Sequence, residues 1–378
     1  MLTMQDIKNH AKNIACALPL MLCASFTQAA EQDCSFLDYT KIQKPQSTSI
    51  AQRWRIKTHI MAEDNGDPCA LNILDEHKDN NADTIYNIAS LTKKMTAVIA
   101  WDEIKAGRLD PEEELIISDW AYEQSSQRTE KTTITVREAL QTMMIASAND
   151  AATTLAVRIM SGKNQKWGTK DVKNWEEQFA QQHMTAKAHE LGMVHTNYHN
   201  ATGLDMPLRS DKILNGVRYY SQPLSTSTPR EQAFLSSYIR NTHPEIVSDS
   251  ALPKIYLQNT RTPYTNLLIR NTNRLLPGSI KKDADPIEDV IGLKTGGLTA
   301  SGANQSTIVE FNVQGQAHHL IIETAGDSKN KHFKSSARAR NNTIHTLVNA
   351  GKEMLNEEYS TPPALTASAY SPHPTGQR

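Results

Sequence analysis

Hydrophobic and polar residues along the chain follow two periods, and the periods change in a definite order. Residues 54–61 and 70–74 alternate in the two-residue period of strands, and the turn-forming residues 65–68 separate them. The helical period then prevails through the middle of the chain, and alternation returns before a last helical stretch. This order predicts one α/β domain whose first and last strands share an antiparallel sheet.

Start and stop residues place the helices more closely. Thr135 and Glu138 have the spacing of a capping box, which opens a helix that runs toward Ser147. Gly107 and Gly192 stand where two other helices end. The other predicted helices span residues 91–106, 150–160, 176–191, 230–240 and 338–354, and the C-terminal strands span 291–295, 306–312 and 319–324.

Charge and length limit the possible functions. The 378 residues suffice for one large domain or two ordinary ones, and the formal net charge is −1. No basic cluster favours nucleic acid as a partner. From residue 359 onward the chain is rich in Pro, Ser and Thr, so we expect a domain over residues 31–357 and a disordered tail over 358–378.

The first 30 residues have the form of a secretory signal. Lys8 and Lys12 precede the apolar stretch 14–26, and small residues follow at Ala29 and Ala30. The apolar stretch is too short for a comfortable membrane span, and no later segment approaches about 18 apolar residues. We therefore expect a protein exported to the periplasm through a cleaved signal, without a stable membrane anchor.

The mature chain would keep two cysteines. Cys16 and Cys23 lie in the signal, which leaves Cys34 and Cys69. An even pair in an exported protein predicts a disulfide between them, and two unrelated thiols are the alternative.

The most informative short motif is Ser-x-x-Lys. It begins at Ser90, Ser279 and Ser328, but the second and third copies stand in polar turn sequences. Ser90 instead opens an apolar helix. Residues three apart lie on the same helix face, so the Lys93 amine can reach the Ser90 hydroxyl. Burial would lower the pKa of Lys93 and leave a neutral amine as a base. A capping serine followed by a surface lysine is the alternative.

Two further motifs follow in a fixed order. Ser147-Ala148-Asn149 offers a second hydroxyl and an amide, and Lys-Thr-Gly at 294–296 offers a cation on a strand. Singly they would indicate a polar helix junction and an exposed strand end. Together with Ser90 they describe a nucleophile, its base, a proton relay and a carboxylate-binding strand.

Longer stretches around these motifs resemble the D-alanyl-D-alanine carboxypeptidases, a family of serine peptidases among the low-molecular-mass penicillin-binding proteins. The resemblance implies a β-lactamase/transpeptidase-like fold, with a five-stranded antiparallel sheet flanked by helices and a helical subdomain. It extends over roughly residues 87–351. The matching stretches are residues 88–97, 147–152, 187–193, 200–205, 227–231 and 273–276.

The resemblance also implies roles for single residues. Ser90 would form an acyl-enzyme with the penultimate D-alanine of a peptidoglycan stem peptide, and Lys93 would be its general base. Ser147 would relay a proton to the leaving amine, and Asn149 would orient Lys93 and the substrate amide. β-Lactams would acylate the same serine and inhibit the enzyme.

The carboxylate-binding side follows in the same way. Lys294 and Thr295 would bind the terminal carboxylate, and Gly296 would let the substrate backbone approach the strand. The backbone N–H groups of Ser90 and Gly297 would form the oxyanion hole. This chemistry requires no metal and no organic cofactor. Residues 206–226 and 249–272 are longer than in most relatives, which leaves the preferred substrate open.

Other functions remain as alternatives. D,D-Endopeptidase action on cross-links would use the same site. A class A-like β-lactamase would need a deacylating glutamate, and residues 211–215 match that loop only with an aspartate. A decayed, cell-wall-binding domain would have lost Ser90 or Lys93 first. A zinc site at His189, His195 and His199 is disfavoured because Met193 stands where a second helix ligand would be.

Overall fold

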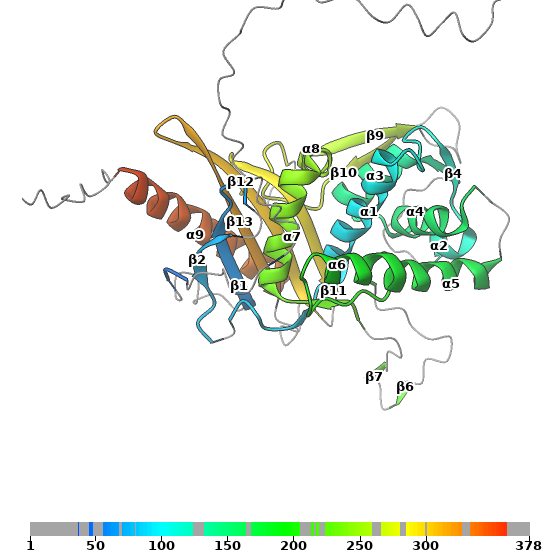
Figure 1. Cartoon of the computed structure of the whole chain (residues 1–378), viewed down its shortest axis with the longest axis horizontal. Coiled ribbons are helices and arrows are strands. Elements are labelled where there is room, and N and C mark those ends of the chain that lie inside the picture. Colours follow the sequence, from blue (N-terminus) through cyan, green and yellow to red (C-terminus); the bar gives the residue numbers. More distant parts are fainter. Residues whose placement is uncertain are drawn as a thin grey trace, which may run out of the picture. The chain divides into compact units, whose positions relative to one another are not determined.

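A computed structural model describes most of the chain between residues 37 and 360 (Figure 1). The described residues are 37, 45–47, 56–67, 70–79, 81–123, 132–163, 168–204, 213–214, 217–218, 224–258, 266–279, 285–298, 301–326 and 333–360. The predicted signal at residues 1–30 and the cysteines Cys34 and Cys69 lie outside them. Within the described ranges no helix is both long and apolar enough to cross a membrane.

The main sheet has five antiparallel strands in the order β11-β12-β13-β1-β2. This confirms the predicted fold, including the pairing of N-terminal with C-terminal strands. The three C-terminal strands extend beyond the predicted bounds at both ends. The strands are β1 (Ile56–Glu63), β2 (Asn72–Glu76), β11 (Val290–Leu298), β12 (Gly302–Val313) and β13 (Gln316–Gly326).

Helices cover both faces of this sheet, which explains the apolar runs of its strands. On β13, Leu320 and Ile322 pack with the C-terminal helix α9 (Phe333–Ser360) in one core cluster. Ile321, between them in sequence, belongs to the other core cluster, on the side of α7 (Pro229–Thr242). Figure 1 shows α9 and α7 on opposite sides of the strands.

The helical part of the chain lies between the N-terminal and C-terminal strands in sequence. The predicted capping box is confirmed, because Thr135 Oγ1 accepts from the Glu138 N–H and the Glu138 carboxylate accepts from the Thr135 N–H. The helices are η1 (Ala89–Thr92), α1 (Lys93–Lys105), α2 (Asp119–Glu123), α3 (Val136–Ile145), α4 (Asn149–Ser161), α5 (Thr169–Phe179), η2 (Ala180–Thr185), α6 (Ala186–Glu190) and α8 (Pro244–Ala251).

Two predicted helices differ in extent from the observed ones. The C-terminal helix, predicted over 338–354, spans Phe333–Ser360. Residues 176–191 were expected to form the other, but that helix begins at Thr169 and continues to Glu190 through the π-helical turn η2. Asp171 fixes the earlier start, since its carboxylate accepts from the backbone N–H of Gly168. A π-turn holds one residue more than an α-turn, which the helical period does not reveal.

Short strand pairs, which the alternation did not predict, connect the helices. One of these pairs, β9–β10, falls inside the long stretch 249–272. The pairs are β3 (Tyr86–Asn87) with β8 (Thr226–Ser227), β4 (Glu114–Ile116) with β5 (Thr133–Thr135), β6 (Ile213–Leu214) with β7 (Val217–Arg218), and β9 (Lys254–Gln258) with β10 (Asn266–Arg270).

The last helix passes the predicted domain boundary at residue 357. It runs to Ser360, and the Tyr359 hydroxyl donates to Glu63 Oε1 at 3.1 Å. This contact joins the end of α9 to β1. The rest of the predicted tail lies outside the described residues.

Candidate active site

Ser90 and Lys93 meet as the Ser-x-x-Lys spacing predicts. Ser90 lies in the 3-10 turn η1, and Lys93 is the first residue of α1. Lys93 Nζ lies 2.9 Å from Ser90 Oγ. Ala89, just before the serine, has φ +49°, a backbone conformation that costs a non-glycine residue about 1–3 kcal/mol. The surrounding structure thus holds the serine at a strained turn.

Among the residues that the structure describes, the hydrogen-bond partners of Lys93 are uncharged oxygens. Besides Ser90 Oγ, its ammonium contacts Asn149 Oδ1 at 2.7 Å and the Thr202 carbonyl oxygen at 2.6 Å. Its side chain is fully buried. Burial, reinforced by Lys294, holds the pKa of Lys93 well below its usual value, and the carboxyls of Glu176 and Asp150 oppose this. A lysine in this state can accept the proton of a serine hydroxyl.

A tight loop at residues 200–203 places the Thr202 carbonyl oxygen next to the Lys93 amine. Asn200 Oδ1 accepts from the backbone N–H groups of Thr202 and Gly203, at 3.1 and 2.6 Å. Gly203 has φ +76°, and a Cβ on it would lie 1.9 Å from the Ala89 carbonyl oxygen. Only glycine therefore permits the loop to approach η1 so closely.

Ser147 and Asn149 lie where α3 passes into α4. Asn149 is the first residue of α4 and contacts Lys93 directly. Ser147 is buried and has φ +60°, so a second strained non-glycine residue adjoins the site. The two motif residues thus lie in one junction, and Asn149 contacts Lys93 from there.

The Lys-Thr-Gly motif lies on β11, which ends the sheet order. Lys294 is fully buried, burial lowers its pKa to about 7, and its ammonium donates to the Thr295 carbonyl oxygen at 2.9 Å. A Cβ on Gly296 would lie 2.9 Å from the Ile88 carbonyl oxygen and 3.2 Å from the Leu91 nitrogen. Gly296 therefore permits β11 to pack against η1, whereas close approach of the substrate was expected. Gly297 follows and pairs with Ala303 of β12.

Thr272 adjoins this motif, although the sequence analysis did not single it out. Its hydroxyl lies 2.5 Å from the Thr295 hydroxyl, and it also donates to the Ile145 carbonyl oxygen at 3.1 Å. Thr272 thus connects the end of β10 with α3 and with the expected carboxylate site. The flanking Asn271 and Asn273, next to a stretch that resembles the family, were the available signal.

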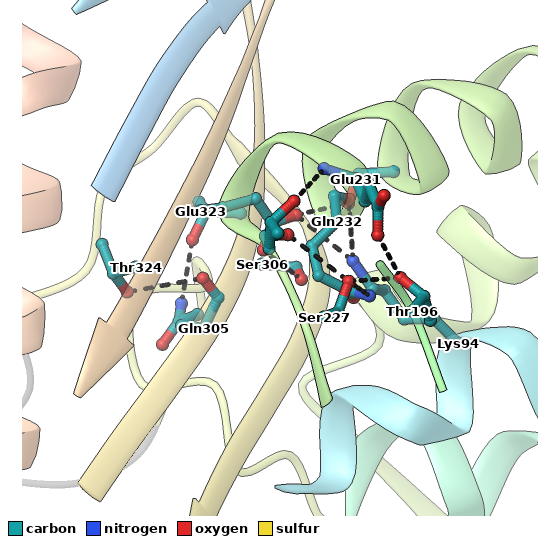
Figure 2. A network of polar contacts seen from close by, with 12 residues as sticks. Lys94, Thr196, Ser227, Glu231, Gln232, Gln305, Ser306, Glu323 and Thr324 are labelled. Atoms are coloured by element: carbon teal, nitrogen blue, oxygen red, sulfur yellow. Dashed lines mark hydrogen bonds and ion pairs between the residues drawn. The ribbon is translucent and has the colours of Figure 1, made fainter. Parts of the chain in front are cut away.

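Lys94 is a second functional candidate that the sequence analysis missed. It is as buried as Lys93, and its ammonium donates to Ser236 Oγ at 2.9 Å and to Glu323 Oε1 at 3.2 Å. Figure 2 shows Lys94 and Glu323 within one network of polar side chains. A cation inside the apolar run of α1 and an acid inside the apolar run of β13 were the signals for this pair.

The three histidines considered for zinc do not converge. His189 Nε2 lies 3.2 Å from the Thr196 carbonyl oxygen, and His195 Nδ1 lies 3.0 Å from Glu231 Oε1. Among the residues that the structure describes, no group of three His, Cys, Asp or Glu side chains is arranged to hold a metal ion. The β-lactamase-like stretch 211–215 lies outside those residues apart from β6.

The arrangement can support acyl transfer. It combines a hydroxyl, a buried lysine with a low pKa, and a second buried lysine at the edge of a sheet. An edge strand can bind an extended peptide through its backbone groups. The site therefore suits a peptide that carries a carboxylate close to the bond to be cleaved.

Comparisons with known proteins agree with this geometry. The family model of D-alanyl-D-alanine carboxypeptidases matches residues 72–317, which is more than half of the chain. Similar solved structures include a penicillin-binding protein of Listeria monocytogenes with ampicillin bound, at 24% identity and a TM-score of 0.54, covering 78% of this chain and 97% of that one. Penicillin-binding protein 6B of Escherichia coli is 21% identical, with a TM-score of 0.56 and coverage of 79% and 78%. At these identities the solved structures show the shared fold.

Proposed function

The chain belongs to the D-alanyl-D-alanine carboxypeptidase family, and from this premise we propose how its residues carry out the reaction. The protein is a serine-type peptidase that removes the terminal D-alanine of peptidoglycan stem peptides. The observation that carries the proposal is the contact between Ser90 Oγ and a buried Lys93 whose other partners are uncharged. A neutral lysine amine at that position is the base that a serine nucleophile needs.

In the acylation step, Ser90 Oγ attacks the carbonyl carbon of the penultimate D-alanine and gives its proton to Lys93. The oxyanion is bound by the backbone N–H groups of Ser90 and Gly297, each contributing about 3–4 kcal/mol to the transition state. Ser147 passes a proton to the leaving D-alanine amine, and Asn149 orients Lys93. Water then hydrolyses the ester and restores Ser90.

Recognition of the terminal carboxylate is assigned to β11. Lys294 in its protonated form supplies the charge, and the Thr295 hydroxyl supplies a hydrogen bond. The Thr272 hydroxyl lies 2.5 Å from the Thr295 hydroxyl, directly beside the expected carboxylate site. Thr295 can donate to the carboxylate once Thr272 donates to Thr295 in place of the Ile145 carbonyl oxygen. Gly296 contributes by seating the strand against η1.

β-Lactams carry a carboxylate and a strained amide, so the same groups would bind them and Ser90 would open the ring. We propose slow hydrolysis of the resulting acyl-enzyme, hence inhibition. Export to the periplasm through a signal at residues 1–30 is also part of the proposal, since peptidoglycan is the substrate.

The first test is mass spectrometry of the purified mature protein after incubation with penicillin, together with D-alanine release from a pentapeptide. We expect one adduct, on Ser90, and stoichiometric release of D-alanine. A folded protein without an adduct would overturn the proposal in favour of a decayed binding domain. Cleavage of cross-linked dimers faster than of pentapeptide would identify an endopeptidase instead.

The matched variant is Ser90→Ala, which keeps the backbone of η1 and removes the nucleophile. It should lose the adduct completely while its circular dichroism spectrum stays that of the wild type. Labelling that survives this substitution would mean that another residue is the nucleophile.

A further inference from the structure

A buried carboxyl lies beside the candidate site and has no part in the mechanism above. Glu176, on α5, is only 3% exposed. Its carboxyl accepts a hydrogen bond from Thr153 Oγ1 at 3.2 Å and another from the backbone N–H of Ala201. Burial raises the pKa of Glu176 to about 7, and Lys93 acts to lower it. A carboxyl is seldom buried this fully unless its charge has a partner.

Two elements connect Glu176 with Lys93. In α4, Asn149 contacts Lys93, and Thr153, four residues later on the same helix face, contacts Glu176. In the loop after η2 and α6, the Thr202 carbonyl contacts Lys93, and the N–H of Ala201 contacts Glu176. Each element therefore holds both ionisable groups, and the two groups keep a fixed geometry.

A small cavity lies between these contacts. It measures about 10 Å³ and is lined by the polar residues Asn149, Thr153, Glu176 and Thr202 together with Trp120, Ala121 and Leu204. This is close to the least space that one water molecule needs, and the polar lining offers it partners. The same Asn149 and Thr202 that bind Lys93 thus form a wall of the cavity that Glu176 faces.

We propose that Glu176 is a positioning residue for the reaction, a buried carboxyl that acts through Asn149, Thr202 and the small cavity to govern when Lys93 holds a proton. The inference rests on the proposed role of Lys93 as general base. Ionised Glu176 favours the ammonium form of Lys93, whereas neutral Glu176 favours the free amine. The two groups then titrate as a coupled pair.

The other charged groups facing Lys93 do not replace Glu176 in this role. Lys294 of β11 and Asp150 of α4 act on Lys93 with opposite signs. Glu177, next to Glu176 on α5, has a 44% exposed side chain and lies 3.9 Å from Lys173. Solvent screens that charge, so it provides a matched control for a change of charge on the same helix.

The test is the pH dependence of the rate at which a fluorescent penicillin acylates the full mature protein, measured between about pH 5 and pH 9. Glu176→Gln keeps the shape of the side chain and removes its charge. We expect the rise of the rate with pH to move to lower pH by about 0.5–1 unit, because Lys93 loses a charge that stabilises its ammonium. Glu177 has the smallest of the effects on the pKa of Glu176, so Glu177→Gln should move the profile much less than Glu176→Gln does. Glu176→Asp should return the profile toward the wild type.

Each result decides the inference. A reduced rate with an unmoved pH profile would make Glu176 a packing residue and overturn the proposal, as would a change confined to hydrolysis of the acyl-enzyme. Should Glu176→Gln fail to fold, Thr153→Ala removes a donor to the carboxylate, and its profile should move in the same direction by less. Absence of a wild-type adduct on Ser90 would refute the proposed function itself, so the two failures are distinguishable.

Discussion

Lys93 and Lys94 follow one another in α1, and both side chains are fully buried, yet their surroundings differ in one decisive respect. Lys93 contacts three uncharged oxygens, the farthest of them Ser90 Oγ. Lys94 contacts a backbone carbonyl, a serine hydroxyl and the Glu323 carboxylate (Figure 2). Burial lowers the pKa of both lysines, but at Lys94 the Glu323 carboxylate opposes this effect and favours the charged form, whereas the described hydrogen-bond partners of Lys93 include no carboxylate. One lysine is therefore suited to chemistry and its neighbour to anchoring.

The ion pair between Lys94 and Glu323 is connected to the strand that carries Lys294. Glu323 accepts from Ser236 Oγ and from Ser306 Oγ, each at 2.6 Å, so both of its oxygens are satisfied. Glu323 pairs with Ser306 across the sheet, and Ser306 pairs with Lys294. Lys94 thus ties the helix that carries Lys93 to the strand row that ends at Lys294.

The largest effects are expected when each of the two lysines is exchanged for methionine in turn, which tests whether their roles differ. Lys93→Met should reduce the rate of penicillin acylation by about 10²–10⁴-fold, since the general base is lost while Ser90 remains. The variant should stay folded, because a buried ammonium and its desolvation penalty are removed together. Stopped-flow labelling and thermal unfolding measure the two effects. A labelling rate near that of the wild type would refute the role of Lys93.

Whereas Lys93→Met should reduce the rate of acylation, Lys94→Met should reduce the stability of the fold. It leaves Glu323 buried without its cation, at a cost of about 3–5 kcal/mol in the free energy of unfolding. Burial already raises the pKa of Glu323, and loss of Lys94 would raise it further. A raised pKa makes the variant most stable below the unfolded pKa of about 4.3, and that stability is lost as pH rises through the folded pKa. Urea unfolding at low and neutral pH tests this.

The second substitution that completes this experiment is Glu323→Gln. In the double variant Lys94→Met/Glu323→Gln, neither position carries a charge, and the amide can accept from one of the two serines, Ser236 and Ser306, and donate to the other. Most of the lost stability should return, and the pH dependence should disappear. A double variant as unstable as Lys94→Met would mean that Lys94 acts by packing and not by charge.

The sequence analysis predicted Lys93 as a site residue, whereas the apolar run around Lys94 marked that lysine as unusual without revealing its partner. The three-residue spacing from Ser90 marks Lys93, because helix geometry alone brings the two side chains together. Lys94 depends on Glu323, which is 229 residues away and meets it only after β13 joins the sheet. Local patterns also predicted the strands of the main sheet and the capping box at Thr135, because alternation and cap spacing likewise depend on residues close in sequence.

Glu176 and Thr272 were not singled out from the sequence, and the causes are related. Glu176 stands in a polar stretch whose helical period is interrupted by η2, so its burial could not be inferred. Thr272 acquires its contact with Thr295 through the β9–β10 hairpin, which weak alternation did not predict. The positive φ angles of Ala89 and Ser147 likewise result from tertiary packing, since neither residue type favours them.

A third buried lysine, Lys294, has a role that the pH dependence of the reaction can test. Lys294 must be protonated to bind a carboxylate, and its pKa is about 7. As pH rises through this value the free enzyme loses the ammonium, so kcat/KM for a pentapeptide should fall by up to about tenfold per unit. The same peptide with a C-terminal amide should show a shallower fall. Equal slopes for both peptides would remove Lys294 from carboxylate binding.

The smallest expected effect comes from Ser306→Ala, which touches the anchoring network and leaves both lysines in place. Loss of a hydrogen bond to the Glu323 carboxylate should cost about 1.5–3 kcal/mol of stability. The acylation rate should stay within about twofold of the wild type, because Ser90 and Lys93 keep their contacts. A rate that falls further than this, in a folded protein, would show that the anchoring network also sets the position of Lys294. Lys94 and its hydrogen-bond partners would then contribute to catalysis as well as to stability.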